Sequence, residues 1–263
     1  MGRLDPKTGQ MSEVDTGRGS RPRRVATAPD GTMWVALYGN GKLAKLDPAA
    51  LQGVNAAIHL AGDPIAKGRW TPAKKRRIRD SRILGTRLLA ETLAKLSPPP
   101  QALVCASAIG YYGDRGEEVL TEESAVGAGF LAETAQEWGQ ACRPAADAGI
   151  RVVHLRFGII LHPDGGALKM MLPPFRLGLG GPLGNGRQWM SWITREDVVG
   201  SIVFALANHG LRGPLNVVSP NPVTNREFSR ALGKALHRPA LFPVPAFAVR
   251  LLFGEMADEA LLA

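Results

Sequence analysis

The chain has 263 residues, is 45% hydrophobic and 21% charged, and carries a formal net charge of +9. This length and composition are typical of a folded globular protein with one large domain or two small ones. They argue against a membrane protein, because no apolar run reaches the ~18–20 residues that a span needs. No secretory signal is visible at the N-terminus, so the expected location is the cytoplasm.

The ionisable residues form no recognisable metal or nucleic-acid motif. Cys105 and Cys142 are expected to be free thiols, and the five histidines have no cysteine or histidine partner at zinc-ligand spacing. His59 and His154 lie in predicted buried strands and are expected to be satisfied core histidines. The basic run at residues 67–82 favours a solvated helix face, because no nucleic-acid-binding module accompanies it. Nucleic acid and membranes are therefore not expected as partners.

Residues 1–48 form a β-rich segment with an internal repeat. The triplet Leu-Asp-Pro begins at Leu4 and again at Leu46, and the turn signals PDG and GNG lie between them. The segment resembles one blade of a streptogramin-lyase-like or NHL-type propeller, a blade being roughly 40–50 residues long. A single blade cannot bury its faces without neighbours. The sequence therefore predicts an orphan β segment that joins an unrelated domain near residues 46–51.

From residue 51 onward, predicted strands and helices alternate. The strands are short apolar runs, and the helices are longer, the first with apolar residues near helical spacing. The strands span 54–62, 101–108 and 150–161, and the helices span 72–96 and 129–149. Pro144 is expected to interrupt the second helix. This alternation predicts an α/β fold with a doubly wound parallel sheet over residues 51–161.

Residues 162–263 have a different pattern. A stretch rich in Gly and Pro is followed by a helix with Thr194 as its N-cap, a short strand, and a second helix. Thr224 and Glu227 have the spacing of a capping box at the start of that second helix. The pattern predicts a smaller lobe that binds the substrate.

Several motifs of one family follow in order along the chain. They are "HLAG" and "CASAIGYYG" at two strand ends, "LRFGIIL" in the third strand, and "PPFRLGLGGPLGNGRQWMSWI" and "PLNVVSPNPVTNREFSRALG" in the lobe. Over residues 51–263 the chain resembles the atypical extended short-chain dehydrogenase/reductases, and among them the epimerase family of the YfcH type. The resemblance implies a Rossmann-like fold, NADP as the cofactor with NAD as the alternative, and a small-molecule substrate of the nucleotide-linked kind.

The sequence departs from the family pattern at three places. No strand–GxxGxxG–helix opens the domain, so the sheet is predicted to lack its first strand and glycine-rich turn, and cofactor binding to be impaired or lost. Phe130 and Thr134 stand where the superfamily's Tyr-x-x-x-Lys pair is expected. The chain ends at "FGEMADEALLA", where the family pattern continues, so the lobe is predicted to be truncated.

The candidate site residues follow the strand ends, where doubly wound sheets bind their ligands. By resemblance, the cofactor-binding candidates are Leu60, Ala61, Gly62, Arg82, Phe157, Gly158 and Ile160. The catalytic candidates are Ser107, which matches the superfamily's serine, and Tyr111 and Tyr112, one of which could serve as an acid. Arg187, Gln188 and Trp192 are candidates for a substrate wall. Core packing, helix-surface ion pairs and aromatic lining are the structural alternatives.

Three functions remain open at this stage. The leading one is an NAD(P)-dependent epimerase or oxidoreductase of unknown substrate. The alternatives are a non-enzymatic chimeric fragment or pseudoenzyme, and a propeller-derived binding or lyase module.

Overall fold

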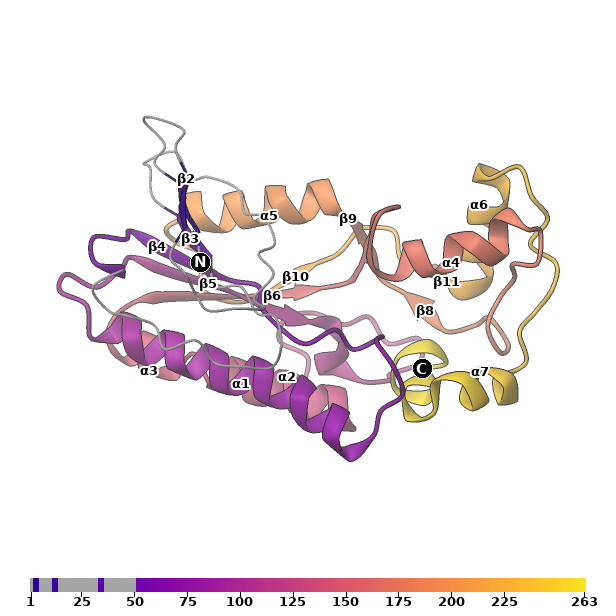
Figure 1. Cartoon of the computed structure of the whole chain (residues 1–263), viewed down its shortest axis with the longest axis horizontal. Coiled ribbons are helices and arrows are strands. Elements are labelled where there is room, and N and C mark those ends of the chain that lie inside the picture. The colour runs from indigo at the N-terminus through magenta and orange to yellow at the C-terminus, as the bar shows by residue number, and fades with distance from the viewer. Residues whose placement is uncertain (1, 5–10, 14–32, 36–50) are drawn as a thin grey trace.

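The computed structural model describes residues 2–4, 11–13, 33–35 and 51–263 (Figure 1). Seven of its described strands form the main sheet, in the order β10, β6, β5, β4, β3, β1 and β2. Their bounds are Gly213–Val217, Arg151–Phe157, Ala102–Ala108, Ala56–His59, Met33–Val35, Gly2–Leu4 and Met11–Glu13. The strands from β10 to β3 are parallel, and β1 is antiparallel to both β3 and β2. The predicted α/β fold with a parallel sheet is confirmed.

The short strands of the N-terminal segment extend this sheet. The sequence predicts a sheet that lacks its first strand. In the structure the parallel strand β3 lies beside β4, on the side opposite β5. Apart from these three strands, the predicted blade over residues 1–48 lies outside the described residues, and the blade stays a prediction.

Helices cover both faces of the sheet. The helices α1 (Pro72–Ala94), α2 (Phe130–Gln140) and α3 (Arg143–Asp147) lie on one face, and α5 (Arg195–Ala207) lies on the other (Figure 1). The break between α2 and α3 comes where Pro144 was expected to interrupt the helix, and Pro144 stands in the first turn of α3.

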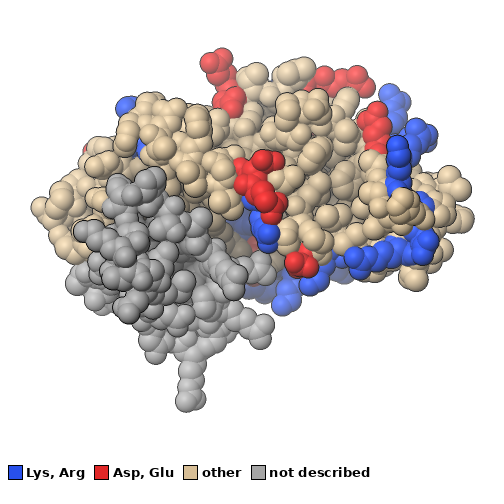
Figure 2. Space-filling model, turned by 90° about the horizontal axis from the view of Figure 1, so that it is seen from above, with Lys and Arg blue, Asp and Glu red and all other residues tan. Residues whose placement is uncertain are grey.

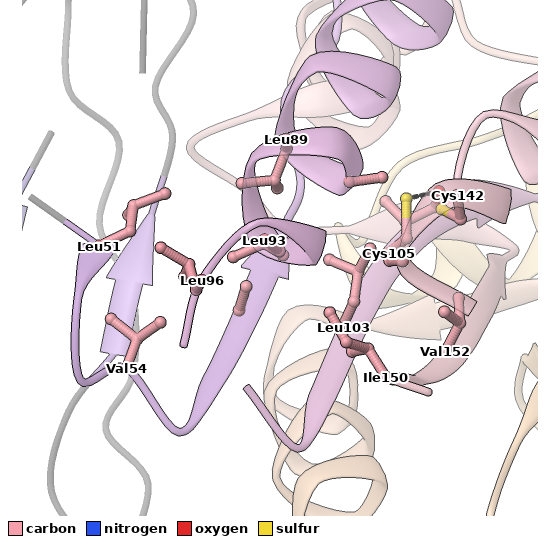
Figure 3. Packing of buried hydrophobic residues seen from close by; sticks show 14 of the residues in the cluster. Leu51, Val54, Leu89, Leu93, Leu96, Leu103, Cys105, Cys142, Ile150 and Val152 are labelled. Atoms are coloured by element: carbon pink, nitrogen blue, oxygen red, sulfur yellow. Dashed lines mark hydrogen bonds between the residues drawn. The ribbon is translucent and has the colours of Figure 1, made fainter. Parts of the chain in front are cut away.

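Two apolar clusters hold these layers together, one on each side of the sheet. The first joins β4, β5 and β6 to α1 and the α2–α3 region, and its members include Leu93, Leu103 and Cys142 (Figure 3). The second lies under α5 and includes Val104 and Leu155. Leu103 and Val104 point to opposite faces because side chains alternate along a strand, so β5 is buried on both sides.

The lobe occupies one end of the molecule, to the right in Figure 1. Its elements are two small sheets and three helices, followed by a final π-helical turn. They are β7 (Ile159–Leu161) with β9 (Trp192–Thr194), β8 (Trp189–Met190) with β11 (Val223–Thr224), α4 (Gly166–Arg176), α6 (Asn225–Ala235), α7 (Ala246–Phe253) and η3 (Ala257–Leu261). Thr194 caps α5, and Thr224 with Glu227 forms a complete capping box on α6, so both predicted caps are confirmed.

Both cysteines are buried free thiols, as expected. Among the described helices, none combines the length and the apolarity that crossing a membrane requires. In the same part of the chain, no three His, Cys, Asp or Glu side chains gather in an arrangement that could hold a metal ion.

Candidate functional site

The parallel strands bring most of the candidate residues to one edge of the sheet. β4, β5 and β6 are neighbours and run the same way, so their carboxyl ends lie together, on the side that faces the lobe (Figure 1). Residues 60–62 follow β4, the short helix η2 (Ile109–Tyr112) follows β5, and Gly158 follows β6. This edge is the ligand-binding position of doubly wound sheets.

The loop after β4 is fixed by polar side chains of α1. The Asp63 carboxylate pairs with the buried ammonium of Lys74, which also donates to the Pro64 carbonyl over 2.6 Å. The Asp63 amide donates to the Ser81 hydroxyl over 2.9 Å. Neither Lys74 nor Ser81 was a candidate in the sequence. Each contacts the loop after β4 from a position about ten or more residues further along the chain, and only the fold brings the two together.

Arg82 lies directly against Gly62. A Cβ atom on residue 62 would stand 3.0 Å from the Arg82 Cζ, so a side chain there would displace the guanidinium by a few tenths of an ångström. The guanidinium donates from Nη1 to the carbonyls of Asp63 and Ile78, over 3.1 and 3.0 Å. Burial lowers the pKa of Arg82 to about 10, and the Asp63 charge opposes this shift, so the group stays a cation at neutral pH. The structure thus holds a positive charge at the carboxyl end of β4, beside partly exposed Ala61 and the more exposed Leu60.

The two tyrosines after β5 have different environments. The Tyr112 hydroxyl is buried, accepts a hydrogen bond from Arg156 Nη1 over 2.7 Å and donates one to Asn216 Oδ1 over 2.6 Å. The Arg156 guanidinium lies 3.7 Å from the centre of the Tyr111 ring, a cation–π contact. Ser107 is buried on β5 in register with Arg156. Tyr112 is therefore held in an internal network, whereas Tyr111 is only partly buried.

Gly158 marks the point where the chain leaves the main sheet. Its amide donates to the Val217 carbonyl over 3.1 Å, and a Cβ there would stand 2.6 Å from the Ser191 carbonyl oxygen. The chain then continues into β7 and pairs with β9. Phe157 packs against both apolar clusters, and Ile160 packs against the one under α5, so both have the core contacts that were the structural alternative.

The substrate candidates lie at two short strands of the lobe: Arg187 and Gln188 directly precede β8, and Trp192 begins β9. Arg187 is exposed, and Trp192 donates from Nε1 to the Asn221 carbonyl over 3.2 Å. The Gln188 amide donates to the carbonyls of Leu183 and Leu261, over 3.2 and 2.8 Å. Gln188 therefore links the loop before β8 to η3. The spacing of residues in the sequence does not predict this contact.

The start of α2 carries no proton-transfer pair. Phe130 makes an edge-on contact with Trp70, the ring centres being 5.3 Å apart. Thr134 is buried, and its hydroxyl has no hydrogen-bond partner within the described structure. The Glu259 carboxylate accepts hydrogen bonds from the amides of Phe130 and Leu131, both 3.1 Å long. Sequence reasoning missed Glu259, because the carboxylate comes from the far end of the chain.

His59 differs from its expectation. It is buried on β4, in register with Cys105, but neither ring nitrogen has a hydrogen-bond partner among the described residues. The Nδ1 of His154 is likewise buried and unpartnered. The expectation of a satisfied core histidine is therefore wrong for His59. Burial lowers the pKa of His59 to about 4.

No family model matches the chain. Comparisons with known proteins nevertheless find relatives that are similar in sequence and in structure. The chain is 46% identical over 226 residues to the epimerase family protein Mb2239 of Mycobacterium bovis, covering 86% of this chain and 74% of that protein. The crystal structure of human epimerase family protein SDR39U1 (isoform 2) with NADPH matches with a TM-score of 0.78 and 35% identity, over 82% of this chain and 76% of that one.

A second solved structure is similar over more of this chain. The nucleoside-diphosphate sugar epimerase from Corynebacterium glutamicum matches with a TM-score of 0.63 and 34% identity. The match covers 91% of this chain and 50% of that one.

Proposed function

We infer a function from one premise: the chain belongs to the epimerase family. We propose that it binds a nicotinamide cofactor, NADP(H) in the first place, across the carboxyl ends of β4, β5 and β6. We further propose redox or epimerase chemistry on a small-molecule substrate of the nucleotide-linked kind. The narrower YfcH assignment remains a prediction.

The observation that carries the proposal is the Arg82 guanidinium held against Gly62. Within the described structure, the hydrogen bonds of the Arg82 side chain leave from Nη1, so Nε and Nη2 are the donors that a phosphate oxygen would use. The missing Cβ of Gly62 lets the cation and the backbone reach the same point. The negatively charged phosphates of a nicotinamide dinucleotide suit this positive charge.

The cofactor would supply the hydride acceptor or donor, and the chain would supply orientation and a proton. Ser107 would orient a carbonyl or hydroxyl of the substrate, as the resemblance implies. Tyr111 is the better of the two tyrosine candidates for the acid, since the Tyr112 hydroxyl already has both an internal donor and an internal acceptor. Arg187 and Trp192 would contact the substrate from the lobe side.

A second candidate function, cofactor binding without catalysis, is favoured by α2. Phe130 and the buried Thr134 provide neither a phenol nor an ammonium group at the place where the superfamily carries its Tyr-Lys pair. The predicted loss of cofactor binding has no support, because a relative with 35% identity was crystallised with NADPH. We therefore propose retained binding.

Calorimetric titration of the chain with NADPH, and then with NADH, tests the proposal. Saturable binding is expected, and Arg82→Gln should weaken it at least about tenfold, because a charge-assisted hydrogen bond contributes ~1.5–3 kcal/mol. The matched control is Arg87→Gln, an exposed arginine on the same helix, which should bind like the parent chain. A cooperatively folded parent chain that binds neither nucleotide would refute cofactor binding. Equal affinities of the parent chain and Arg82→Gln would refute the role of Arg82.

A further inference from the structure

Arg156 on β6 is a buried cation without a counter-charge. On the face of the molecule shown in Figure 2, many Lys and Arg side chains lie exposed over the lobe end, where water solvates their charges. Arg156 is only 7% exposed, and no carboxylate of the described residues forms an ion pair with it. Burying a charge is costly unless it is paired. The missing counter-charge of Arg156 therefore needs an explanation.

The hydrogen bonds of Arg156 go to neutral groups. Nη1 donates to the Tyr112 hydroxyl over 2.7 Å and to the Glu122 carbonyl over 3.1 Å. The Tyr111 ring covers one face of the guanidinium, as the cation–π contact shows. The Glu122 carboxylate contacts a different group, the Asn216 amide, from which it accepts a hydrogen bond over 2.7 Å. These contacts fix the orientation of the guanidinium but do not neutralise its charge.

One edge of the Arg156 guanidinium remains available to a ligand. In the described structure its hydrogen bonds leave from Nη1, and Nε and Nη2 have no acceptor. Neither of these nitrogens is among the buried side-chain atoms that lack a partner, so this edge is not sealed inside the fold. Nε and Nη2 point the same way in the plane of the group. With such a pair of donors, arginine binds two oxygens of one carboxylate or phosphate.

The position of Arg156 in the sheet connects it to the proposed chemistry. Its neighbours in register are Ser107 on β5 and Asn216 on β10, so these polar side chains lie in a row near the carboxyl ends of the strands. The cofactor candidate Arg82 lies at the end of β4, two strands away from β6. Neighbouring strands are about 4.8 Å apart, so roughly 10 Å separates β4 from β6. A single phosphate on Arg82 therefore leaves the charge of Arg156 unmatched.

Given the function proposed above, on which this step rests, we propose that Arg156 binds an anionic group of the substrate through Nε and Nη2. The group is a carboxylate or a phosphate, so the substrate of this site is an acid. The bound anion would hold the substrate beside Ser107 and Tyr111, the residues proposed to orient it and to transfer a proton. The structural alternative is that Arg156 only holds Tyr112 and the segment at Glu122.

Titrations with small anions, followed by the assigned amide NMR signals of the chain, test the proposal. The probes are acetate, which carries a carboxylate, and inorganic phosphate, and neutral acetamide is the control ligand. At least one anion should shift the signals of Tyr111, Tyr112 and Asn216 saturably, with a dissociation constant on the order of 10 mM. Tighter binding of acetate would indicate a carboxylate substrate, and tighter binding of phosphate a phosphorylated one. No NADPH is present, so this proposal and cofactor binding can fail separately.

Variants locate the bound anion. Arg156→Lys keeps the positive charge but loses the paired donors, so it should raise the dissociation constant at least about tenfold. Arg156→Gln should abolish saturable binding. The matched control is Arg212→Gln, at an exposed arginine directly before β10 and so at the opposite edge of the sheet, which should bind like the parent. Far-UV circular dichroism checks the folding of each variant, and the affinity of Arg156→Lys decides if Arg156→Gln does not fold.

Three results would overturn the proposal. The first is a parent chain whose signals neither anion shifts. The second is an unchanged affinity in Arg156→Lys, because the anion would then bind to another basic group, and a lower melting temperature of that variant would leave Arg156 with a structural role alone. The third is binding that Arg82→Gln removes and Arg156→Lys retains, which would assign the anion to the proposed cofactor site.

Discussion

His59 should make the stability of this protein depend on pH in a way that one substitution removes. The imidazole is buried on β4, and neither nitrogen has a hydrogen-bond partner in the described structure. Protonation would place an uncompensated charge beside Cys105 in the apolar layer under α1. The folded state therefore binds this proton less readily than the unfolded chain does, and burial is the cause.

The size of the effect follows from the two pKa values. The pKa of His59 falls from 6.5 to about 4 on folding. Between these values the unfolded state holds more protons, so the free energy of unfolding decreases as the pH falls through this window. Each pKa unit corresponds to about 1.4 kcal/mol, so His59 accounts for a loss of about 3 kcal/mol between pH 6.5 and pH 4. Above pH 6.5 both states carry a neutral imidazole and the effect vanishes.

Urea unfolding of the parent chain and of His59→Leu, at several pH values from about 7.5 to 4.5, isolates this contribution, since carboxylates titrate equally in both proteins. At the upper pH the variant should be as stable as the parent or slightly more so, because it removes two unpartnered nitrogens at similar volume. At the lower pH it should be more stable by about 2–3 kcal/mol. The matched control is His209→Gln, at an exposed histidine, which should follow the parent at every pH.

Parallel curves for the parent chain and His59→Leu would refute the reasoning. They would mean that His59 finds a partner or water in the folded state, so that its charged form is not penalised. A variant that loses several kcal/mol at every pH would also count against it, since an unpartnered imidazole would then be contributing to packing or bonding that the structure does not record.

Two further substitutions test the close backbone contact at Gly158 and the hydrogen bonds of the buried Tyr112 hydroxyl. Gly158→Ala should destabilise the fold by about 1–3 kcal/mol in urea unfolding, because the added Cβ would stand 2.6 Å from the Ser191 carbonyl oxygen. The control is Gly200→Ala on α5, where no atom lies within 4 Å of the added Cβ. This variant should be as stable as the parent or more stable by up to about 1 kcal/mol. Tyr112→Phe should cost about 1–3 kcal/mol in the same assay, since it removes the two hydrogen bonds that the buried hydroxyl makes with Arg156 and Asn216. A free energy of unfolding equal to that of the parent would contradict the network.

The sheet and its helices could be predicted because their signals are local. Apolar runs of strand length, leucines at helical spacing, Pro144 at a helix break and the capping residues Thr194 and Thr224 each act within a few neighbouring residues. Parallel crossovers then follow from the alternation of strands and helices. The edge of the sheet that collects the candidate residues was therefore predictable before any coordinate was known.

The contacts that define the site act over long separations and could not be predicted. Glu259 caps α2 across 129 residues, and Gln188 meets the Leu261 carbonyl across 73. No periodicity or spacing encodes either contact, because both depend on where η3 comes to lie beside α2 and the loop before β8. The unpartnered nitrogens of His59 could not be predicted either, since the sequence of a buried strand does not show whether its histidine has a hydrogen-bond partner.

The paired tyrosines show how the structure separates residues that the sequence treats alike. "YY" at positions 111 and 112 offers two equivalent phenols, and the motif gives no reason to prefer one. In the structure, Arg156 donates to one hydroxyl and stacks against the other ring. A phenol whose donor and acceptor are both satisfied inside the fold must break a buried bond before it can transfer a proton, which costs about 1–3 kcal/mol. The hydrogen bonds of each hydroxyl therefore decide which tyrosine is structural and which is available for proton transfer. Tyr112 is the structural one.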